Sequence, residues 1–308
     1  MNTKIWYHVV AFVTVTIWGS TFVFTKLLLL NGLSPAQIFT LRFIIAYVLL
    51  LAFSLLFRPR EHQWLAVPWS EVRKEGWGCL VKRELLMLLL GVTGGSLYFL
   101  TENEALNYTT TTNVSLIVCS CPLVAALLVG IFYKSQRLNL VQNIGMLMAA
   151  LGVAVVVLNG HFVLRLSPIG DSLALAANLC WAVYSLLMIP ANRHYNAFFI
   201  TRKVFFYGLL TMLPYYIMVP AWPSMEVLLR PQVVANLLFL GVVASMLCFM
   251  VWTWVMQKIG AVKATNYVYV NPLSTIVFAH LVLNEQITLF FLIGAVLILV
   301  GMYLADKS

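Results

Sequence analysis

The chain has 308 residues, of which 62% are hydrophobic and only 9% are charged. Because an ordinary soluble domain is about 25% charged, a water-soluble fold could not bury this much apolar surface, and the composition predicts an all-α protein in a bilayer. The net charge of +9 would suit a nucleic-acid-binding protein, but the positions of Lys and Arg indicate membrane topology instead. The five cysteines are an odd number and lie mostly in apolar runs, which argues against a disulfide framework.

Apolar runs long enough to cross about 30 Å of hydrocarbon recur along the whole chain. We expect ten membrane-spanning helices, at 6–27, 35–57, 84–106, 111–132, 138–158, 169–190, 197–220, 233–257, 262–283 and 288–305. The first run is too long for a cleaved signal peptide and lacks a small-residue cleavage site. Only one connection is long, 58–83, and its three tryptophans among charged residues predict an interfacial segment on the cytoplasmic surface.

The same pattern of residues occurs twice in the chain, which is a signal of architecture. Five spans belong to a first repeat, 1–158, and five to a second repeat, 159–308. The matching pairs are Trp18 with Trp181, Gly91 with Gly241, Gly145 with Gly294, and Gly152 with Gly301.

The distribution of Lys and Arg predicts that both termini are cytoplasmic. With the N-terminus inside, only Lys26, Arg165 and Arg230 fall outside. The inside connections and ends collect Lys4, Arg58, Arg60, Arg73, Lys74, Lys82, Arg83, Lys134, Arg137, Arg193, Arg202, Lys203, Lys258, Lys263 and Lys307. Because each half has an odd number of spans, the halves have opposite orientation, which is a common scaffold of secondary transporters. We expect an integral protein of the plasma membrane, the inner membrane in a bacterium.

Polar side chains follow one face of several predicted spans. Thr14, Trp18 and Thr21 share a face of the first span, and Trp181 and Ser185 hold the corresponding place in the sixth. A single polar residue more often only joins two helices, but equivalent stripes in both halves indicate one central cavity. The expected substrate-binding residues are Trp18, Thr21, Tyr98, Asn113, Trp181, Tyr184, Asn266 and Tyr269.

Charged residues inside a membrane are costly and mark function more often than elsewhere. Glu102 shares a helix face with Gly91, Gly95 and Tyr98, where another helix or a ligand can approach closely. It is the candidate for proton coupling; the alternative is a permanently paired carboxylate. Arg42, inside the second span, either pairs within the bundle or extends to the interface.

Pro122 lies inside the fourth predicted span and Pro272 inside the ninth. Each removes an intrahelical hydrogen bond and frees a carbonyl group. Broken helices at a repeat interface point to a transport site, whereas a simple packing kink is an equal alternative.

The ordered set of motifs resembles the EamA-like repeat of the drug/metabolite transporter superfamily over nearly the whole chain. The motifs are Trp18-Gly-Ser, Ala105-Leu-Asn-Tyr-Thr, Pro122, Trp181-Ala-Val-Tyr, the run from Ala264 to Pro272, and Leu283-Asn-Glu-Gln. The family's frequent Gly-Glu-Arg turn is replaced by Ser135-Gln136-Arg137, and the long 58–83 connection is an insertion. The resemblance implies ten helices around a central cavity and carriage of small organic solutes such as amino acids, other metabolites or drugs, often outward.

The sequence therefore predicts a secondary transporter, with export favoured, and no enzyme, cofactor or metal. A proton-independent uniporter is the first alternative, and a membrane-embedded enzyme or a receptor is less favoured. The sequence contains no GxSxG, HExxH or Walker A motif. Expected partners are a small-molecule substrate and membrane lipid, with protons as an open coupling ion, no nucleic acid, and a monomer or homodimer.

Overall fold

The computed structural model describes residues 3–57, 65–67, 69–108, 114, 117–133, 138–158, 167–219, 222–283 and 288–306. Within these ranges every regular element is helical, as the composition predicted. Eight of the described helices are long and apolar enough to cross a membrane. The chain is therefore a multi-pass, all-α membrane protein.

The helices follow one another with short connections. The first half contains α1 (Thr3–Leu30), α2 (Pro35–Phe57), α3 (Trp69–Glu75), α4 (Trp77–Gly91), η2 (Val92–Ser96), α5 (Leu97–Tyr108), α7 (Cys121–Phe132) and α8 (Leu140–Leu158). The second half contains α9 (Pro168–His194), α10 (Ala197–Leu210), α11 (Leu213–Met218), α12 (Met225–Leu228), α13 (Pro231–Leu238), η4 (Phe239–Leu247), α14 (Cys248–Ile259), α15 (Ala261–Asn266), η5 (Tyr267–Val270), α16 (Asn271–Leu283) and α17 (Leu289–Asp306).

The fourth and ninth predicted spans are interrupted in the structure. α7 begins at Cys121 after a turn at Ser120, and α16 follows the 3₁₀ segment η5. Pro122 and Pro272 each lie in the first turn of the new helix, where the missing proline N–H costs no hydrogen bond. Both helices are shorter than a full span, so ten complete spans remain a prediction.

The third and eighth predicted spans each contain a π-helical segment. η2 joins α4 to α5, and η4 joins α13 to α14. A shift of 150 residues, which superposes Gly91 on Gly241, also carries η2 into η4. Such segments leave carbonyl groups without their usual helical partners and occur frequently at functional sites.

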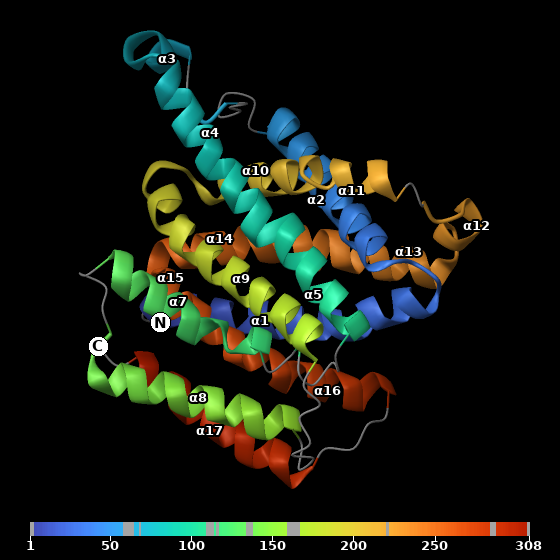
Figure 1. Cartoon of the computed structure of the whole chain (residues 1–308), viewed down its shortest axis with the longest axis vertical. Coiled ribbons are helices and arrows are strands. Elements are labelled where there is room, and N and C mark those ends of the chain that lie inside the picture. Colours follow the sequence, from blue (N-terminus) through green and yellow to red (C-terminus); the bar gives the residue numbers. More distant parts are fainter. Residues whose placement is uncertain are drawn as a thin grey trace.

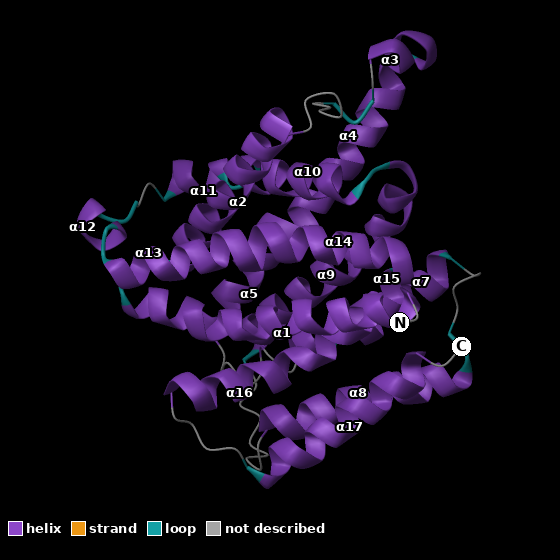
Figure 2. Ribbon diagram, turned by 180° about the vertical axis from the view of Figure 1, so that it is seen from behind, coloured by secondary structure: helices purple, strands orange, loops and turns teal. Residues whose placement is uncertain are grey.

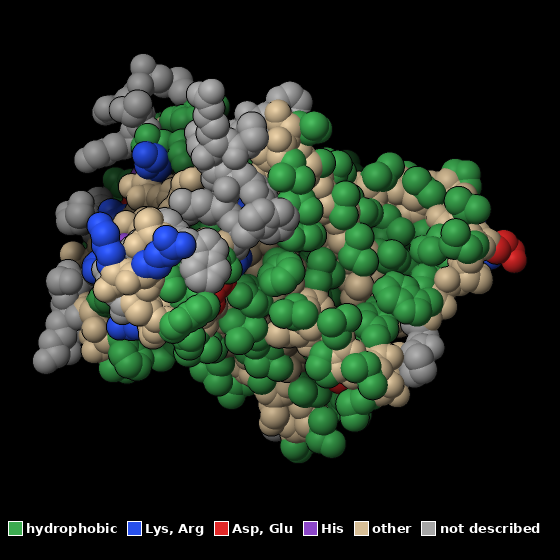
Figure 3. Space-filling view, turned by 90° about the horizontal axis from the view of Figure 1, so that it is seen from above, with side chains coloured by type: hydrophobic (Ala, Val, Ile, Leu, Met, Phe, Trp, Pro, Cys, Tyr) green, Lys and Arg blue, Asp and Glu red, His purple; other side chains and the backbone are tan. Residues whose placement is uncertain are grey.

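The interfacial insertion is shorter than the sequence predicted. Residues 77–83 form the first two turns of α4, which continues as one of the eight long helices. The short helix α3 precedes it and projects beyond the rest of the molecule (Figure 1). Seen from that end, Lys and Arg side chains gather on one side of a surface that is otherwise mostly hydrophobic (Figure 3).

Arg202 and Lys203, which the topology argument counted among the inside cations, lie within the seventh predicted span, 197–220, and not in a connection. Both belong to α10 and are buried, at 4% and 6% exposure. Helix α10 begins at Ala197, before these two residues, because Asn196 caps its start. The Asn196 side-chain oxygen accepts a hydrogen bond from the Phe199 N–H at 2.8 Å. Removing these two residues from the inside set leaves the Lys and Arg asymmetry strong.

The two termini lie on the same side of the molecule, and α12 lies on the opposite side (Figures 1 and 2). The Lys263 ammonium group contacts the Asp306 carboxylate at 3.3 Å, and His8 Nδ1 lies 3.9 Å from the same side chain. His8 near one chain end and Asp306 near the other therefore lie beside each other.

Candidate functional site

Three tryptophans meet at the centre of the main hydrophobic core. The ring of Trp18 in α1 lies 5.8 Å from that of Trp181 in α9 and 5.1 Å from that of Trp252 in α14, and Phe249 packs against both Trp18 and Trp181. Edge-to-face aromatic pairs contribute about 0.5–1.5 kcal/mol beyond their buried area. The two repeat-related tryptophans thus come from opposite halves and contact each other.

The indole N–H groups of Trp18 and Trp181 have different environments. Trp18 Nε1 donates a 2.8 Å hydrogen bond to the carbonyl oxygen of Ala244, which lies in the π-helical segment η4. Among the described residues, Trp181 Nε1 is buried and has no acceptor. A buried donor without a partner costs about 1–3 kcal/mol, so this N–H is suited to a ligand acceptor.

Two tyrosines extend this aromatic cluster. The rings of Tyr98 in α5 and Tyr184 in α9 each lie 5.2 Å from the Trp181 ring. Tyr184 packs directly on Gly94, since a Cβ atom there would lie 2.4 Å from Tyr184 Cδ2. A glycine in η2 is therefore what allows the Tyr184 ring to reach the cluster.

A carboxylate and a guanidinium lie beside the aromatic rings. Glu102 is 7% exposed and accepts a 2.8 Å hydrogen bond from the Tyr98 hydroxyl. Arg42 Nε in α2 donates a 2.8 Å hydrogen bond to Ser245 Oγ in η4, and its guanidinium carbon lies 5.2 Å from the Phe99 ring centre. Arg42 and Glu102 also interact electrostatically. The site therefore offers one group of each charge in an apolar setting.

The other predicted site residues do not join the aromatic cluster in the described structure. The Thr21 hydroxyl donates to the Trp18 carbonyl at 2.6 Å within α1. Tyr269 is fully buried in a separate cluster with residues of α8 and α17. Asn266 is buried in α15, and its Oδ1 has no hydrogen-bond donor among the described residues. Asn113 lies outside the described residues.

Asn178 joins α9 to the break that precedes α7. Its Nδ2 donates to the Ile117 carbonyl and, at 2.8 Å, to Ser120 Oγ. The Ile117 carbonyl also accepts from the Ser120 N–H and hydroxyl within the turn, so a side chain from the other half binds the turn itself. This contact favours a structural role for the break, one of the two alternatives that the prolines left open.

Trp252, Phe249 and Ser245 were not among the predicted site residues. All three lie in η4 or α14, whose sequence is a nearly continuous apolar run, so periodicity could not distinguish the inward face. The shift of 150 residues could have identified Ser245, because it is the counterpart of Gly95 in the first half, and Gly95 shares a helix face with Glu102.

The described residues contain no group of three His, Cys, Asp or Glu side chains arranged to hold a metal ion. The four cysteines at 119, 121, 180 and 248 are buried free thiols, which agrees with their interpretation as small hydrophobic residues. What the site combines is aromatic surface, two opposite charges and two indole N–H groups, those of Trp181 and Trp252, that have no acceptor among the described residues.

The sequence profile of the EamA-like transporter family matches the chain twice, over residues 5–158 and 168–305. An uncharacterized transporter of Archaeoglobus fulgidus is 27% identical, with 100% of this chain and 99% of the relative aligned. A solved protein crystal structure superposes with a TM-score of 0.72 at 18% identity, over 97% of this chain and 96% of that one, which shows the same fold.

Two further relatives carry names that describe a cargo. A protein of Escherichia coli strain K12 named "probable amino-acid metabolite efflux pump" is 24% identical, over 96% of this chain and 93% of its own length. A "probable terminal-alkyne amino-acid exporter" of Streptantibioticus cattleyicolor is 25% identical, over 73% of this chain and 74% of its own length.

Proposed function

Because this chain belongs to the EamA-like transporter family, we propose that it exports a small zwitterionic solute of the amino-acid type across the plasma membrane. Two relatives named for amino-acid cargo support the substrate class. The observation that carries the proposal is the placement of Arg42 and Glu102, of opposite charge, beside the aromatic cluster.

In this proposal each part of the solute has a matching group. The Arg42 guanidinium is the counter-ion for a carboxylate, because its planar fork suits that geometry. Glu102 is the counter-ion for an ammonium group, and the Trp181 N–H supplies an additional donor. The rings of Trp18, Tyr98 and Tyr184 receive the apolar side chain of the solute.

Alternating access between residues 1–158 and 159–308 is the proposed mechanism of movement. It requires the two halves to be rigid bodies of opposite orientation around one site. The contact between Trp18 and Trp181 supports a site shared by both halves. We expect both termini to be cytoplasmic, so the exported solute enters the protein from the side on which the termini lie. We expect the transporter to be a monomer or a homodimer.

A proton-independent uniporter is the second candidate, and a specific observation favours it. Glu102 accepts a hydrogen bond from Tyr98 and interacts with Arg42, as a permanently paired carboxylate would. Proton coupling instead requires Glu102 to gain and lose a proton during each cycle. Glu102 is the residue on which the two candidates differ.

The test is a binding and transport assay on purified protein reconstituted in liposomes. A panel of amino acids, matched amino-acid amides and decarboxylated amines is screened by thermal shift, because a ligand that binds only the folded state raises apparent stability. Intact zwitterions should stabilise the protein and be transported, whereas amides and amines should do neither. Equal responses to zwitterions and amines would refute the assigned role of Arg42.

A further inference from the structure

A buried ion pair joins the two halves away from the aromatic site. Lys203 Nζ in α10 lies 2.9 Å from both carboxylate oxygens of Glu84 in α4. The side chains are only 8% and 17% exposed. Lys203 comes from the second half and Glu84 from the first.

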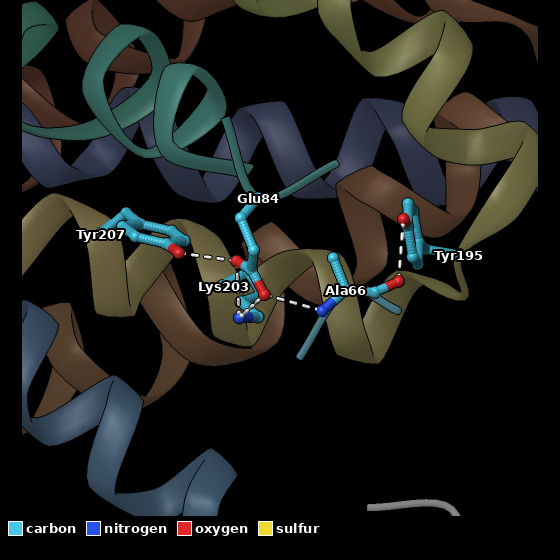
Figure 4. A network of polar contacts seen from close by, with 5 residues as sticks. All are labelled: Ala66, Glu84, Tyr195, Lys203 and Tyr207. Carbon is cyan, nitrogen blue, oxygen red and sulfur yellow. Dashed lines mark hydrogen bonds and ion pairs between the residues drawn. The ribbon is translucent and has the colours of Figure 1, made fainter. Parts of the chain in front are cut away.

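The Glu84 carboxylate also organises the polypeptide around it (Figure 4). The Tyr207 hydroxyl donates to Oε2 at 2.6 Å, and the Ala66 N–H donates to Oε1 at 2.7 Å. The Tyr195 hydroxyl donates to the Ala66 carbonyl at 3.0 Å. One carboxylate therefore holds α4, α10 and the segment 65–67 together.

The aromatic site contains a matching contact between the two halves, without a carboxylate. Arg42 stands in the second helix of the first half as Lys203 does in the second half, since 203 − 42 = 161, close to the Trp18–Trp181 shift. Each cation reaches the third long helix of the other half, Lys203 to Glu84 and Arg42 to Ser245. The Lys203 contact is an ion pair, whereas the Arg42 contact is a hydrogen bond to a hydroxyl.

We propose that the Glu84–Lys203 pair is an ionic latch that closes the cytoplasmic end of the bundle and must separate when that end opens. The side assignment follows from the Lys and Arg distribution, which places the start of α10 inside. The proposal rests on the alternating-access function above. An ion pair suits a latch because both charges are satisfied when it is closed, and both can be hydrated by entering water when it is open.

The chemistry of the pair distinguishes a latch from a fixed link. Glu84→Gln leaves the Lys203 charge in a buried site without a counter-ion, which is strongly unfavourable. In a latch, opening the cytoplasmic end relieves this cost, so the open state becomes more populated. In a fixed link there is no such state, and the substitution only lowers stability.

The experiment measures thiol labelling in a variant without native cysteines, reconstituted in nanodiscs without substrate. One reporter is Met87→Cys, fully buried in α4 three residues beyond Glu84. The other is Leu237→Cys, its counterpart at the shift of 150 residues, 7% exposed. Glu84→Gln should speed labelling of Cys at 87 by about tenfold and slow that at 237. Lys203→Arg should retain the wild-type rates.

The control is Glu226→Gln, which removes the exposed, local pair of Glu226 with Arg230 and should change neither rate. Unchanged labelling at position 87 in folded Glu84→Gln protein, or equal acceleration at both reporters, would overturn the latch. Should Glu84→Gln not fold, Tyr207→Phe removes one donor to the carboxylate and must give the same asymmetric change in smaller size; symmetric or wild-type rates overturn the proposal.

The labelling result is independent of transport. If the wild-type protein moves no zwitterion, the proposed function fails while the labelling data still decide whether a latch exists. If zwitterions are transported but labelling is unaffected, the latch fails and the function stands.

Discussion

Gly152 and Gly294 contact each other backbone to backbone where α8 crosses α17. A Cβ atom on Gly152 would lie 2.8 Å from the Gly294 carbonyl oxygen, and one on Gly294 would lie 2.7 Å from the Gly152 oxygen. Gly145 and Gly301 repeat this relationship, since a Cβ atom added to either would lie 2.6 Å from the carbonyl oxygen of the other. Because the pairing order is reversed, the two helices run antiparallel, and they lie together at one edge of the molecule (Figure 1).

This contact predicts that Gly152→Leu destabilises the protein. The larger side chain has no space between the two backbones, and such overpacking costs about 1–3 kcal/mol. Thermal unfolding in detergent measures the effect as a lower midpoint. Gly78→Ala is the matched control, because no heavy atom lies within 4 Å of a Cβ there and alanine favours a helix. A midpoint for Gly152→Leu equal to that of Gly78→Ala would contradict the contact.

The two central tryptophans should respond differently to phenylalanine. Trp18→Phe loses the hydrogen bond to Ala244, and we expect a stability loss of about 1 kcal/mol. Trp181→Phe removes an N–H without a partner among the described residues, so stability should be unchanged or slightly higher. If that N–H binds the solute, Trp181→Phe should weaken binding by about tenfold. Thermal unfolding measures the stability of both variants, and isothermal titration measures solute binding. A Trp181→Phe protein less stable than Trp18→Phe would contradict the prediction.

Glu102→Gln tests proton coupling. Gln retains the shape that accepts the Tyr98 hydroxyl but carries no proton, so uptake driven by a pH gradient should be abolished. Substrate exchange should continue at higher substrate concentrations, because the solute's ammonium group keeps a hydrogen-bond acceptor but loses its counter-ion. Glu104→Gln, two residues along the same helix and exposed, is the control and should transport normally. The measurement is radiolabelled flux in liposomes with and without the gradient. Undiminished gradient-driven transport by Glu102→Gln would rule out Glu102 as the coupling residue, whereas wild-type transport that ignores the gradient would support the uniporter.

The predicted orientation is tested with two matched helix-cap positions. Asn196 and Ser224 are both exposed and each caps a helix, α10 and α12. In a cysteine-free background, an impermeant maleimide added to intact cells should label Ser224→Cys and leave Asn196→Cys unlabelled, because the Lys and Arg distribution places them on opposite sides. Labelling of Asn196→Cys from outside would invert the topology. The same Lys and Arg distribution predicts that the turn at Glu285 faces outward, and this turn lies outside the described residues.

Sequence patterns were most informative where the physical signal is local or repeated. Apolar length predicted the membrane class, since burying such a run in lipid needs no tertiary information. The glycine spacing predicted that two helices would pack closely, because only small residues permit backbone approach. Trp18 and Trp181 were recognised as a pair from their equivalent places in the two halves.

The charged residues required the tertiary structure. Lys203, near the start of the seventh predicted span, was counted only as an inside cation, because a charge within two turns of a helix end has the same local sequence whether it faces water or the core. Glu84, at the start of the predicted third span, gave no separate signal. Their pairing depends on α4 and α10 being brought together by packing over 119 residues of separation.

The sequence by itself determined that the chain is a helical membrane protein of repeated halves, since composition and periodicity depend only on the solvent and the helix. Which polar groups share a site was decided by tertiary packing. The Glu84 carboxylate acquires its partner from a helix far along the chain, and the low dielectric around it makes that partner decisive for its stability and charge.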